Sequence, residues 1–248
     1  MAVWGCRGEG RFAVRVCYRN KYSMLYAGCE EEYWAWVEAF TKVMTRRDFH
    51  ARYSVSRMIG SGGFANVYKA TEIVSGKRVA VKGFNKKYIG NNHKGKMNLL
   101  QEISMMRGLS NENILKLKEM NETKNSLYLV FDLIEGGDLN DLIEKNKEGL
   151  DESEIVNIMQ GLLRGLKYMS EEGVAHRDLK PANIMFKKTI GIVPEGVVIV
   201  DFGLAASLSD TNPIFKRCGT PGYIAPEVIA INTSSEEPFK ILEKMRYF

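Results

Sequence analysis

The sequence predicts an α+β protein with two lobes, the first rich in strands and the second rich in helices. All but one of the elements that we predict between Tyr53 and Leu133 are strands. Beyond Gly136-Gly137 the apolar residues recur at helical spacing instead. The chain has 248 residues, of which 45% are hydrophobic and 26% charged, so it can bury a sizeable core as one large domain or two smaller ones.

The first 46 residues predict a small strand–strand–helix unit. Arg11–Tyr18 and Tyr22–Ala27 alternate as strands do, and Arg19-Asn20-Lys21 between them suits a hairpin turn. The acidic stretch Glu30-Glu31-Glu32 then predicts the start of a helix, where carboxylates are favourable. The apolar positions of this helix recur at helical spacing: Tyr33, Trp36, Val37, Phe40, Val43 and Met44. A unit of about 35 residues is too small to form a domain by itself.

The strand-rich lobe begins at Tyr53. We predict strands over Tyr53–Ile59, Val67–Ala70, Arg78–Lys82, Leu115–Met120 and Ser126–Leu133, and a helix over Lys96–Arg107. The helix-rich lobe has predicted helices over Asp138–Glu144 and Asp151–Ser170 and a strand over Val197–Val200. Glu154 follows Asp151 by three residues, which predicts a capping box at the start of the long helix.

Composition and charge exclude several classes of protein. The net charge of +5 comes from 35 basic and 30 acidic residues that interleave along the chain, so no nucleic-acid partner is expected. Apolar runs such as Gly196–Val200 are far shorter than the roughly 20 residues of a membrane span, and the N-terminus has no run typical of a secretory signal. The four cysteines have no metal-ligand spacing: Cys6, Cys17, Cys29 and Cys218. We therefore expect reduced thiols, no membrane span and a cytoplasmic protein.

A glycine cluster lies between the first two strands of the strand-rich lobe. It comprises Ile59, Gly60, Ser61, Gly62, Gly63, Phe64, Ala65, Asn66 and Val67. Glycines at such a turn let backbone N–H groups approach phosphate oxygens, because no Cβ is in the way. By itself the cluster is more typical of an ordinary hairpin turn. It is not a P-loop, because no Gly-Lys-Ser or Gly-Lys-Thr follows and the next predicted element is a strand.

Four more motifs follow in order: Val79-Ala80-Val81-Lys82, His176-Arg177-Asp178-Leu179-Lys180-Pro181-Ala182-Asn183, Asp201-Phe202-Gly203 and Ala225-Pro226-Glu227. Lys82 ends an apolar strand, and its ammonium group either extends to solvent or pairs with an acid such as Glu102 on the next helix. Asp201 directly follows the predicted strand Val197–Val200. Each motif alone could arise by chance, but five in this order, on elements of the right type, could hardly do so.

Together these motifs resemble those of a eukaryotic protein kinase, from Tyr53 to about Ile229. His176–Asn183 and Gly219-Thr220-Pro221-Gly222-Tyr223 are similar to the serine/threonine version of the family. Phe131–Leu139 looks like the hinge of calmodulin-dependent-kinase-like or related enzymes. The resemblance implies a kinase-like two-lobed fold, with an antiparallel-sheet N-lobe and a helical C-lobe. It also implies ATP and Mg²⁺ as cofactors.

The resemblance further implies which residues bind ATP. The glycine cluster would cover the phosphates, and Lys82, held by Glu102, would bind the α- and β-phosphates. Asp132 and Ile134 in the hinge would offer backbone groups to adenine. Ala80 would pack on the adenine ring, and Asp138 would contact the ribose. For Asp138 a solvated loop carboxylate is the alternative.

The catalytic roles that the resemblance implies concern positioning and charge rather than covalent chemistry. Asp178 would accept or orient the proton of the substrate hydroxyl, and Lys180 would neutralise charge near the γ-phosphate. Thr220 would support both side chains. Asn183 and Asp201 would be the oxygen ligands of Mg²⁺. Solvated loop carboxylates are the alternative for the two aspartates.

Two positions depart from the family pattern. Ala65 replaces the third glycine of the glycine cluster, where a methyl group adds little bulk. Lys216 stands where many relatives have an activating phosphothreonine, and lysine cannot carry that phosphate. We therefore expect the loop to be active without phosphate, with phosphorylation of Ser207, Ser209 or Thr211 as the alternative.

The resemblance also predicts the domain limits. Residues 10–46, with Trp36-Val37-Glu38-Ala39-Phe40 on the helix, look like the end of a pleckstrin-homology domain. The early strands and basic loop that would bind phosphoinositides are absent from the sequence, so we expect no phosphoinositide binding. Residues 53–230 would be an incomplete kinase domain, because no Asp-x-Trp follows Glu227, and residues 231–248 would be a divergent tail.

The predicted function is transfer of the ATP γ-phosphate to serine or threonine hydroxyls of protein substrates. A catalytically impaired nucleotide-binding or scaffold protein is the alternative, because the late helices of the C-lobe do not follow. A lipid-recruitment module is a third reading, weakened by the missing strands. The sequence does not identify the substrate or a regulatory partner.

Overall fold

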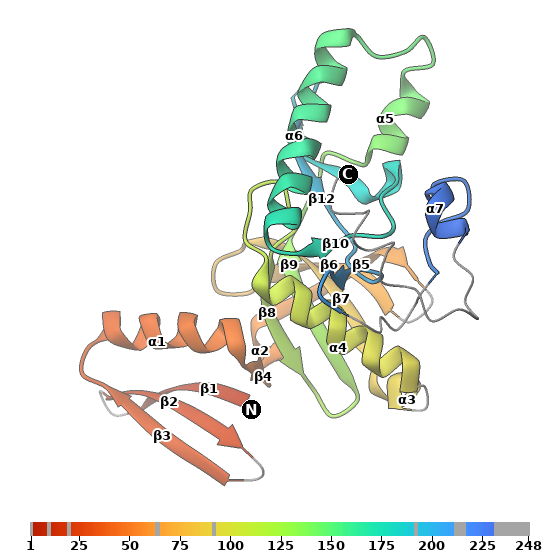
Figure 1. Ribbon diagram of the computed structural model, residues 1–248. Helices are drawn as coiled ribbons and strands as arrows, with labels where there is room; N and C mark the ends of the chain where they lie inside the picture. The colour runs from red at the N-terminus through yellow and green to blue at the C-terminus, as the bar shows by residue number, and fades with distance from the viewer. Residues whose placement is uncertain are drawn as a thin grey trace. The chain divides into compact units, whose positions relative to one another are not determined.

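The computed structural model describes residues 2–8, 11–18, 21–62, 65–90, 93–190, 193–210 and 217–230 (Figure 1). The chain divides into two compact units, of which the first comprises Met1–Asn92 and Leu117–Leu133 and the second comprises His93–Lys116 and Ile134–Phe248. Strands dominate the first unit, whereas the longest helices are in the second. This confirms the predicted α+β class. The predicted tail at 231–248 lies outside the described residues.

The first unit contains one nine-stranded sheet with the order β3-β2-β1-β4-β8-β9-β7-β6-β5. Its strands are β1 (Ala2–Gly8), β2 (Arg11–Tyr18), β3 (Lys21–Ala27), β4 (Thr45–Arg46), β5 (Tyr53–Ser61), β6 (Ala65–Glu72), β7 (Arg78–Asn85), β8 (Leu117–Glu122) and β9 (Ser126–Asp132). Neighbouring strands run antiparallel except at β4, which pairs in parallel with β1 and β8. The five strands predicted after Tyr53 are therefore confirmed.

The predicted N-terminal hairpin and helix are also present, as β2, β3 and α1 (Glu30–Val43). The helix covers the sheet through a small core of Val14, Tyr33, Val37 and Met44. In the N-terminal part of the first unit, three elements were not predicted: β1, β4 and α2 (Phe49–Arg52). Because β4 lies between β1 and β8, residues of the predicted 10–46 unit share one sheet with the strands after Tyr53. A likeness of this unit to a pleckstrin-homology domain stays a prediction.

A short helix, α3 (Lys86–Gly90), follows β7 in the first unit. The elements of the second unit are α4 (His93–Gly108), α5 (Leu139–Lys145), α6 (Glu152–Glu171), β10 (Val174–Ala175), the 3₁₀ turn η1 (Pro181–Asn183), β11 (Ile184–Ile190), β12 (Val193–Ile199), β13 (Ala206–Ser207) and α7 (Pro226–Ile229). The predicted capping box is confirmed, since the Asp151 N–H donates to Glu154 Oε2 over 3.0 Å and the Asp151 side chain accepts from the N–H of Glu154.

Two glycines let α6 lie close to β12. A Cβ atom at Gly161 would be 2.8 Å from Val197 Cβ, and one at Gly165 would be 2.9 Å from Ile199 Cδ1. The two glycines are four residues apart and so lie on one face of the helix. Larger side chains there would push the helix away from β12, the strand that leads to Asp201.

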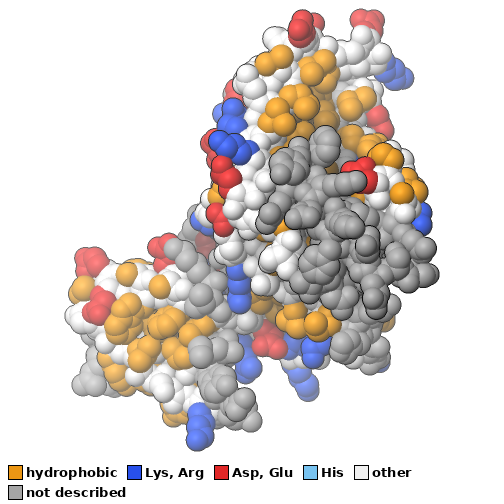
Figure 2. All heavy atoms as spheres, in the orientation of Figure 1, with side chains coloured by type: hydrophobic (Ala, Val, Ile, Leu, Met, Phe, Trp, Pro, Cys, Tyr) orange, Lys and Arg blue, Asp and Glu red, His pale blue; other side chains and the backbone are white. Residues whose placement is uncertain are grey.

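Helices α5 and α6 also have exposed hydrophobic side chains. These are Ile143 on α5 and Ile155, Val156, Met159 and Leu163 on α6. Hydrophobic side chains gather over the two helices in Figure 2. Among the described residues, no helix combines the length and apolarity that crossing a membrane requires.

Candidate active site

The β11–β12 hairpin brings two of the predicted site residues together. Ile184 at the start of β11 pairs with Ile199 at the end of β12. Asn183 directly precedes one strand and Asp201 follows the other by two residues, so both lie at the same end of the hairpin. The Val200 N–H donates to the Asn183 carbonyl over 3.0 Å, which joins the backbones at this point.

A hydrogen-bonded cluster forms around Asp178. The Thr220 hydroxyl donates to Asp178 Oδ1 over 2.7 Å, and the Lys180 ammonium donates to the same hydroxyl over 2.7 Å. Lys180 Nζ also lies 3.1 Å from Asp178 Oδ2. The Asn183 side-chain amide donates to the Asp178 carbonyl over 2.7 Å. The four residues predicted to be catalytic therefore meet in one place, although Thr220 is far from the others in sequence.

The charge of Asp178 is stabilised by its neighbours. Burial raises the pKa of the carboxyl group, but the hydrogen bond from Thr220 and the ion pair with Lys180 lower it by more, so the pKa lies below its ordinary value. Asp178 is consequently ionised at neutral pH and accepts hydrogen bonds. A carboxylate of this kind is a weak base, which suits it to orient a hydroxyl proton.

His176 connects the Asp178 loop to the end of β12. Its ring is 5% exposed, and Nε2 lies 2.9 Å from the Val200 carbonyl. The Asp178 N–H donates to Nδ1, so the ring proton is on Nε2 and is donated to Val200. The ring packs edge-on against Phe202 at 5.2 Å between centroids. Burial lowers the pKa of His176, which is therefore neutral in the folded protein.

Replacing His176 with glutamine is expected to reduce the decrease in the free energy of unfolding that occurs as the pH falls below neutral. A histidine with a lowered pKa in the folded state stabilises the protein above its unfolded pKa of about 6.5, and this contribution is lost as pH falls through the lower folded value. Each unit of lowering is worth about 1.4 kcal/mol. Urea unfolding between about pH 7.5 and 5.5 measures the effect. The exposed His50, changed to glutamine, is the control, and equal slopes for wild type and the His176 variant would contradict the prediction.

Two non-glycine residues beside the cluster have left-handed backbone conformations. Arg177 has φ 66° and Asp201 has φ 61°. Such residues are uncommon and concentrate at functional sites, where surrounding contacts hold the strain. Arg177 is held by a bond of 2.7 Å from Nε to the Leu204 carbonyl.

Asn183 and Asp201 fit the needs of a Mg²⁺ ion that accompanies phosphates. The Asn183 amide nitrogen is engaged by Asp178, so the amide oxygen is the atom that a cation would use. With the Asp201 carboxylate this provides hard oxygen donors at one end of the hairpin. Within the described ranges, no group of three or more His, Cys, Asp or Glu side chains could hold a metal ion. Mg²⁺ commonly takes only one or two carboxylates and completes its shell with phosphate and water oxygens.

Glu102 is placed next to Asp201-Phe202-Gly203 within the second unit. It lies on α4 and is 4% exposed. A Cβ atom at Gly203 would be 3.9 Å from Glu102 Oε2. Gln101 on the same helix donates to the Ala205 carbonyl over 3.2 Å, which ties α4 to this segment. The pairing of Glu102 with Lys82 of the first unit stays a prediction.

The glycine cluster forms the turn between β5 and β6 in the first unit. The Gly62 N–H donates to the Ala65 carbonyl over 2.9 Å, and the Ser61 hydroxyl donates to Asn66 Oδ1 over 3.0 Å. Gly60 and Val67 are paired across the two strands, and Ile59 precedes them on β5. Gly63 and Phe64 lie outside the described residues.

Lys82 and Ala80 project from one face of β7. Successive side chains of a strand alternate, so Val79 and Val81 project from the opposite face. Both valines are buried, whereas Ala80 and Lys82 are half-buried. Lys82 Nζ lies 5.6 Å from the centre of the Phe84 ring, on the face that they share.

The predicted hinge residues have structural partners that the sequence did not reveal. The Asp132 carboxylate lies 3.0 Å from Lys77 Nζ and 3.2 Å from Lys118 Nζ. Burial raises the pKa of Asp132, but the hydrogen bonds from the two lysines lower it by more. These bonds hold the side chain, and the backbone groups are those predicted to bind adenine. No local pattern connects the three residues, because they meet only through sheet pairing.

Asp138 and Ile134 belong to the second unit. Asp138 is the N-cap of α5, where Oδ1 accepts from the Asp141 N–H over 2.9 Å. This structural role stands beside the predicted contact with ribose, which is untested. Ile134 is half-buried and comes before the glycine pair Gly136-Gly137. A Cβ atom at Gly136 would be 2.5 Å from the Phe186 carbonyl, so only glycine fits against β11 there.

Comparison with known proteins gives one family. The model of the protein kinase domain matches residues 53–239. A probable serine/threonine-protein kinase, fhkC of Dictyostelium discoideum, is 32% identical over 85% of this chain and 33% of its own length. A second, the probable serine/threonine-protein kinase fhkE of the same organism, is 36% identical over 72% of this chain and 25% of its own length. A third, CBL-interacting serine/threonine-protein kinase 5 of Arabidopsis thaliana, is 35% identical over 74% of this chain and 40% of its own length. The chain thus spans between a quarter and two fifths of the length of these relatives.

A two-lobed α+β fold whose glycine turn, His-Arg-Asp loop and Mg²⁺ candidates occur in this order defines the class of protein kinases. The chain belongs to the protein kinase family, since the family model covers well over half of it. The predicted resemblance is therefore confirmed. Placement in the calmodulin-dependent-kinase-like group stays a prediction.

Proposed function

We propose that this protein transfers the γ-phosphate of ATP to serine or threonine hydroxyls of protein substrates. The observation that carries the proposal is the cluster of Asp178, Lys180 and Thr220, with hydrogen bonds of 2.7 Å on both sides of the Thr220 hydroxyl. This cluster holds a carboxylate and an ammonium group in a fixed arrangement. Membership of the kinase family and relatives named as serine/threonine kinases support it.

In the proposed reaction, Asp178 accepts a hydrogen bond from the substrate hydroxyl and directs the oxygen toward the γ-phosphorus. A bond forms between that oxygen and phosphorus while the bond from phosphorus to the β,γ-bridging oxygen breaks, and ADP leaves with the bond electrons. The hydroxyl proton passes to Asp178 as the new bond forms. Lys180 offsets the negative charge on the transferred group, and Thr220 keeps both side chains in place.

The nucleotide and the metal would be held by residues of both units. The backbone from Ile59 to Val67 and the Lys82 ammonium would contact the phosphates, with Glu102 orienting Lys82. Asp132 and Ile134 would offer backbone groups to adenine beside Ala80, and Asp138 would contact ribose. Asn183 and Asp201 would hold Mg²⁺, which when bound neutralises phosphate charge. For the joint action of the two units, this proposal rests on family membership.

We also propose a cytoplasmic location, with protein substrates as partners. Among the described residues, Cys29 and Cys218 are free thiols, which supports a reducing compartment.

Thermal unfolding with and without Mg-ATP, followed by radiolabelled phosphate transfer to a serine/threonine peptide mixture, tests the proposed function. We expect Mg-ATP to raise the unfolding temperature and the label to appear on phosphoserine or phosphothreonine. Lys82→Met should abolish the transfer. Stabilisation without any transfer would support the nucleotide-binding scaffold instead. The absence of stabilisation would overturn the proposal.

A further inference from the structure

The segment immediately before the family match is built into the sheet of the first unit. We call residues 45–52, which comprise β4 and α2, the strap; the family model begins only at residue 53. At one end of the strap, Thr45 pairs with Met120 and Arg46 with Asn121 on β8. Arg46 is 8% exposed and its guanidinium donates to both carboxylate oxygens of Asp48. The strap therefore starts from a fixed point on the sheet.

The other end of the strap is fixed by an ion-pair network. Arg52 Nη1 lies 2.7 Å from both carboxylate oxygens of Glu119 on β8, and Arg52 Nη2 lies 2.8 Å from Glu72 Oε1 on β6. Glu119 is 6% exposed, so the pair is shielded from solvent. Burial lowers the pKa of Arg52, but the bonds to Glu119 raise it by more, and the guanidinium is charged at any pH at which the protein folds. The Arg52 guanidinium thus joins carboxylates of two strands, β8 and β6, through charge-assisted hydrogen bonds.

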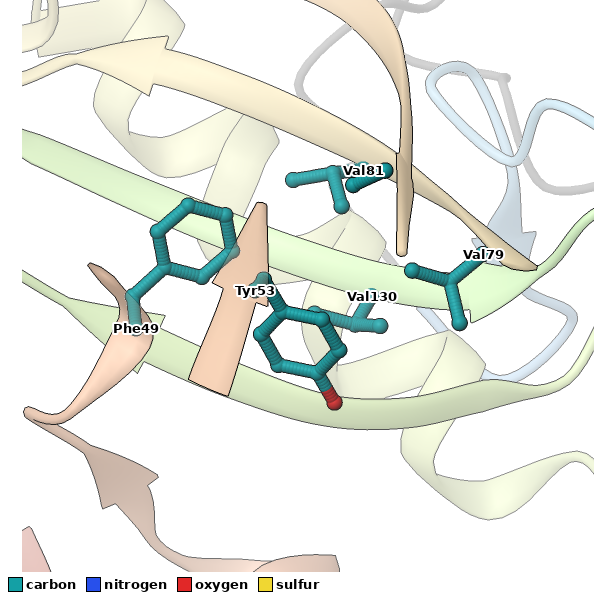
Figure 3. Close-up of a cluster of buried hydrophobic side chains, with 6 residues drawn as sticks. Phe49, Tyr53, Val79, Val81 and Val130 are labelled. Atoms are coloured by element: carbon teal, nitrogen blue, oxygen red, sulfur yellow. The ribbon is translucent and has the colours of Figure 1, made fainter. Parts of the chain in front are cut away.

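Phe49 is the side chain that the strap buries in the sheet. It is 1% exposed, and its ring stacks on Tyr128 of β9 at 4.0 Å between centroids and 11° between planes. A second stack joins it to Tyr53 at 5.4 Å. The buried cluster around it contains Tyr53, Ala70, Val79, Val81 and Val130, as Figure 3 shows for the labelled members.

This cluster supports β7 directly behind Lys82. Val81, the residue before Lys82, is 0% exposed and belongs to the cluster. Gly83, the residue after Lys82, lies under the Tyr128 ring, because a Cβ atom there would be 3.4 Å from Tyr128 Cδ1 and Cε1. Phe49 stacks on that same ring. Both neighbours of Lys82 thus rest on the cluster that Phe49 completes, while Lys82 itself projects from the other face.

We propose that Phe49 is a positioning residue for Lys82, and that the strap is a functional part of the nucleotide-binding machinery although it precedes the family match. Removing the ring leaves a cavity under β7, and the strand settles into it. A shift of about 1 Å at a phosphate-binding group can cost about 100-fold in rate. The effect on catalysis rests on the proposed function, whereas the effect on β7 does not.

Phe49→Ala in the full chain is the test, with Phe49→Leu as the conservative variant and Tyr33→Ala as the matched control. Tyr33 is 5% exposed in the separate core beside α1, so its loss also removes a buried aromatic ring. We expect both alanine variants to unfold at lower temperature, but only Phe49→Ala to raise KM for ATP, by about tenfold, with KM for the peptide unchanged. Phe49→Leu should also raise KM for ATP, but by a smaller factor than Phe49→Ala. Equal KM for ATP in the two alanine variants would overturn the proposal, and if Phe49→Ala does not fold, an unchanged KM in Phe49→Leu would do so.

Amide hydrogen exchange provides a second readout that needs no activity. We expect Phe49→Ala, or Phe49→Leu to a smaller degree, to accelerate exchange in residues 79–85 without changing exchange in β11 and β12. Tyr33→Ala should leave residues 79–85 protected. Unchanged protection of β7 would overturn the proposal even if the wild type transfers phosphate. If the wild type transfers none, faster exchange would still show that the strap positions Lys82, and the proposed function alone would fail.

Discussion

Replacing Asp178 with asparagine is expected to lower kcat for phosphate transfer by roughly 10²–10⁴-fold while Mg-ATP binding stays nearly unchanged. Asparagine keeps the shape of the side chain, and its oxygen can still accept from Thr220. It cannot accept the proton of the substrate hydroxyl, and it loses the charge that faces Lys180. Steady-state transfer to a serine/threonine peptide measures kcat, and thermal unfolding with Mg-ATP measures binding.

The control for this variant is Asp151→Asn on α6. Asp151 caps that helix, and asparagine caps about as well as aspartate, so stability and transfer should both be retained. Transfer that survives in Asp178→Asn at the wild-type rate would show that another group, or a contaminating kinase, does the chemistry.

A second large effect is expected for Asp201→Asn. This substitution should remove most of the increase in ATP affinity that Mg²⁺ causes in the wild type. Replacing even an outer-shell partner of a metal costs about 10–100-fold in affinity, and Asp201 is proposed as a direct ligand. The substitution should keep the backbone conformation at this position. Asp201 has φ 61°, and asparagine tolerates the left-handed region as aspartate does. Titration of Mg²⁺ at constant ATP, followed by thermal unfolding, measures the loss.

Asp141→Asn on the exposed side of α5 is the matched control for Asp201→Asn. The Asp141 side chain has no proposed role in metal binding, so the Mg²⁺ dependence should match that of the wild type. An Asp201→Asn protein with an unchanged Mg²⁺ dependence would remove Asp201 from the proposed metal site. Together the two aspartate variants separate the transfer step from metal-assisted binding.

Much of the fold follows from local patterns. The alternation after Tyr53 predicted β5, β6 and β7, and the pair Asp151 and Glu154 predicted how α6 begins. Each of these signals lies within a few neighbouring residues, because strand alternation and helix capping depend on the chain near each position. Such patterns can therefore be recognised in the sequence before the segments that pack against them are known.

Among the elements that were missed, β4 is the one that exists only through distant partners. β4 has two residues, too few to show any alternation, and it forms because Thr45 and Arg46 pair with Met120 and Asn121. Strand β1 is paired on one side by this same short strand. For the same reason the sequence did not reveal that the N-terminal unit and the strands after Tyr53 share one sheet.

The sequence by itself determined the family of this protein and the functional groups of its proposed site. Phosphate transfer needs particular functional groups at short spacings, and Asp178, Lys180 and Asn183 stand within six residues of one another. Only the tertiary structure decided what holds these groups in place. Thr220 reaches Asp178 across 42 positions of the chain. Behind Lys82, Phe49 and Tyr128 stack although they come from separate segments. Burial and hydrogen bonding depend on which distant segments meet, and a linear sequence does not state that.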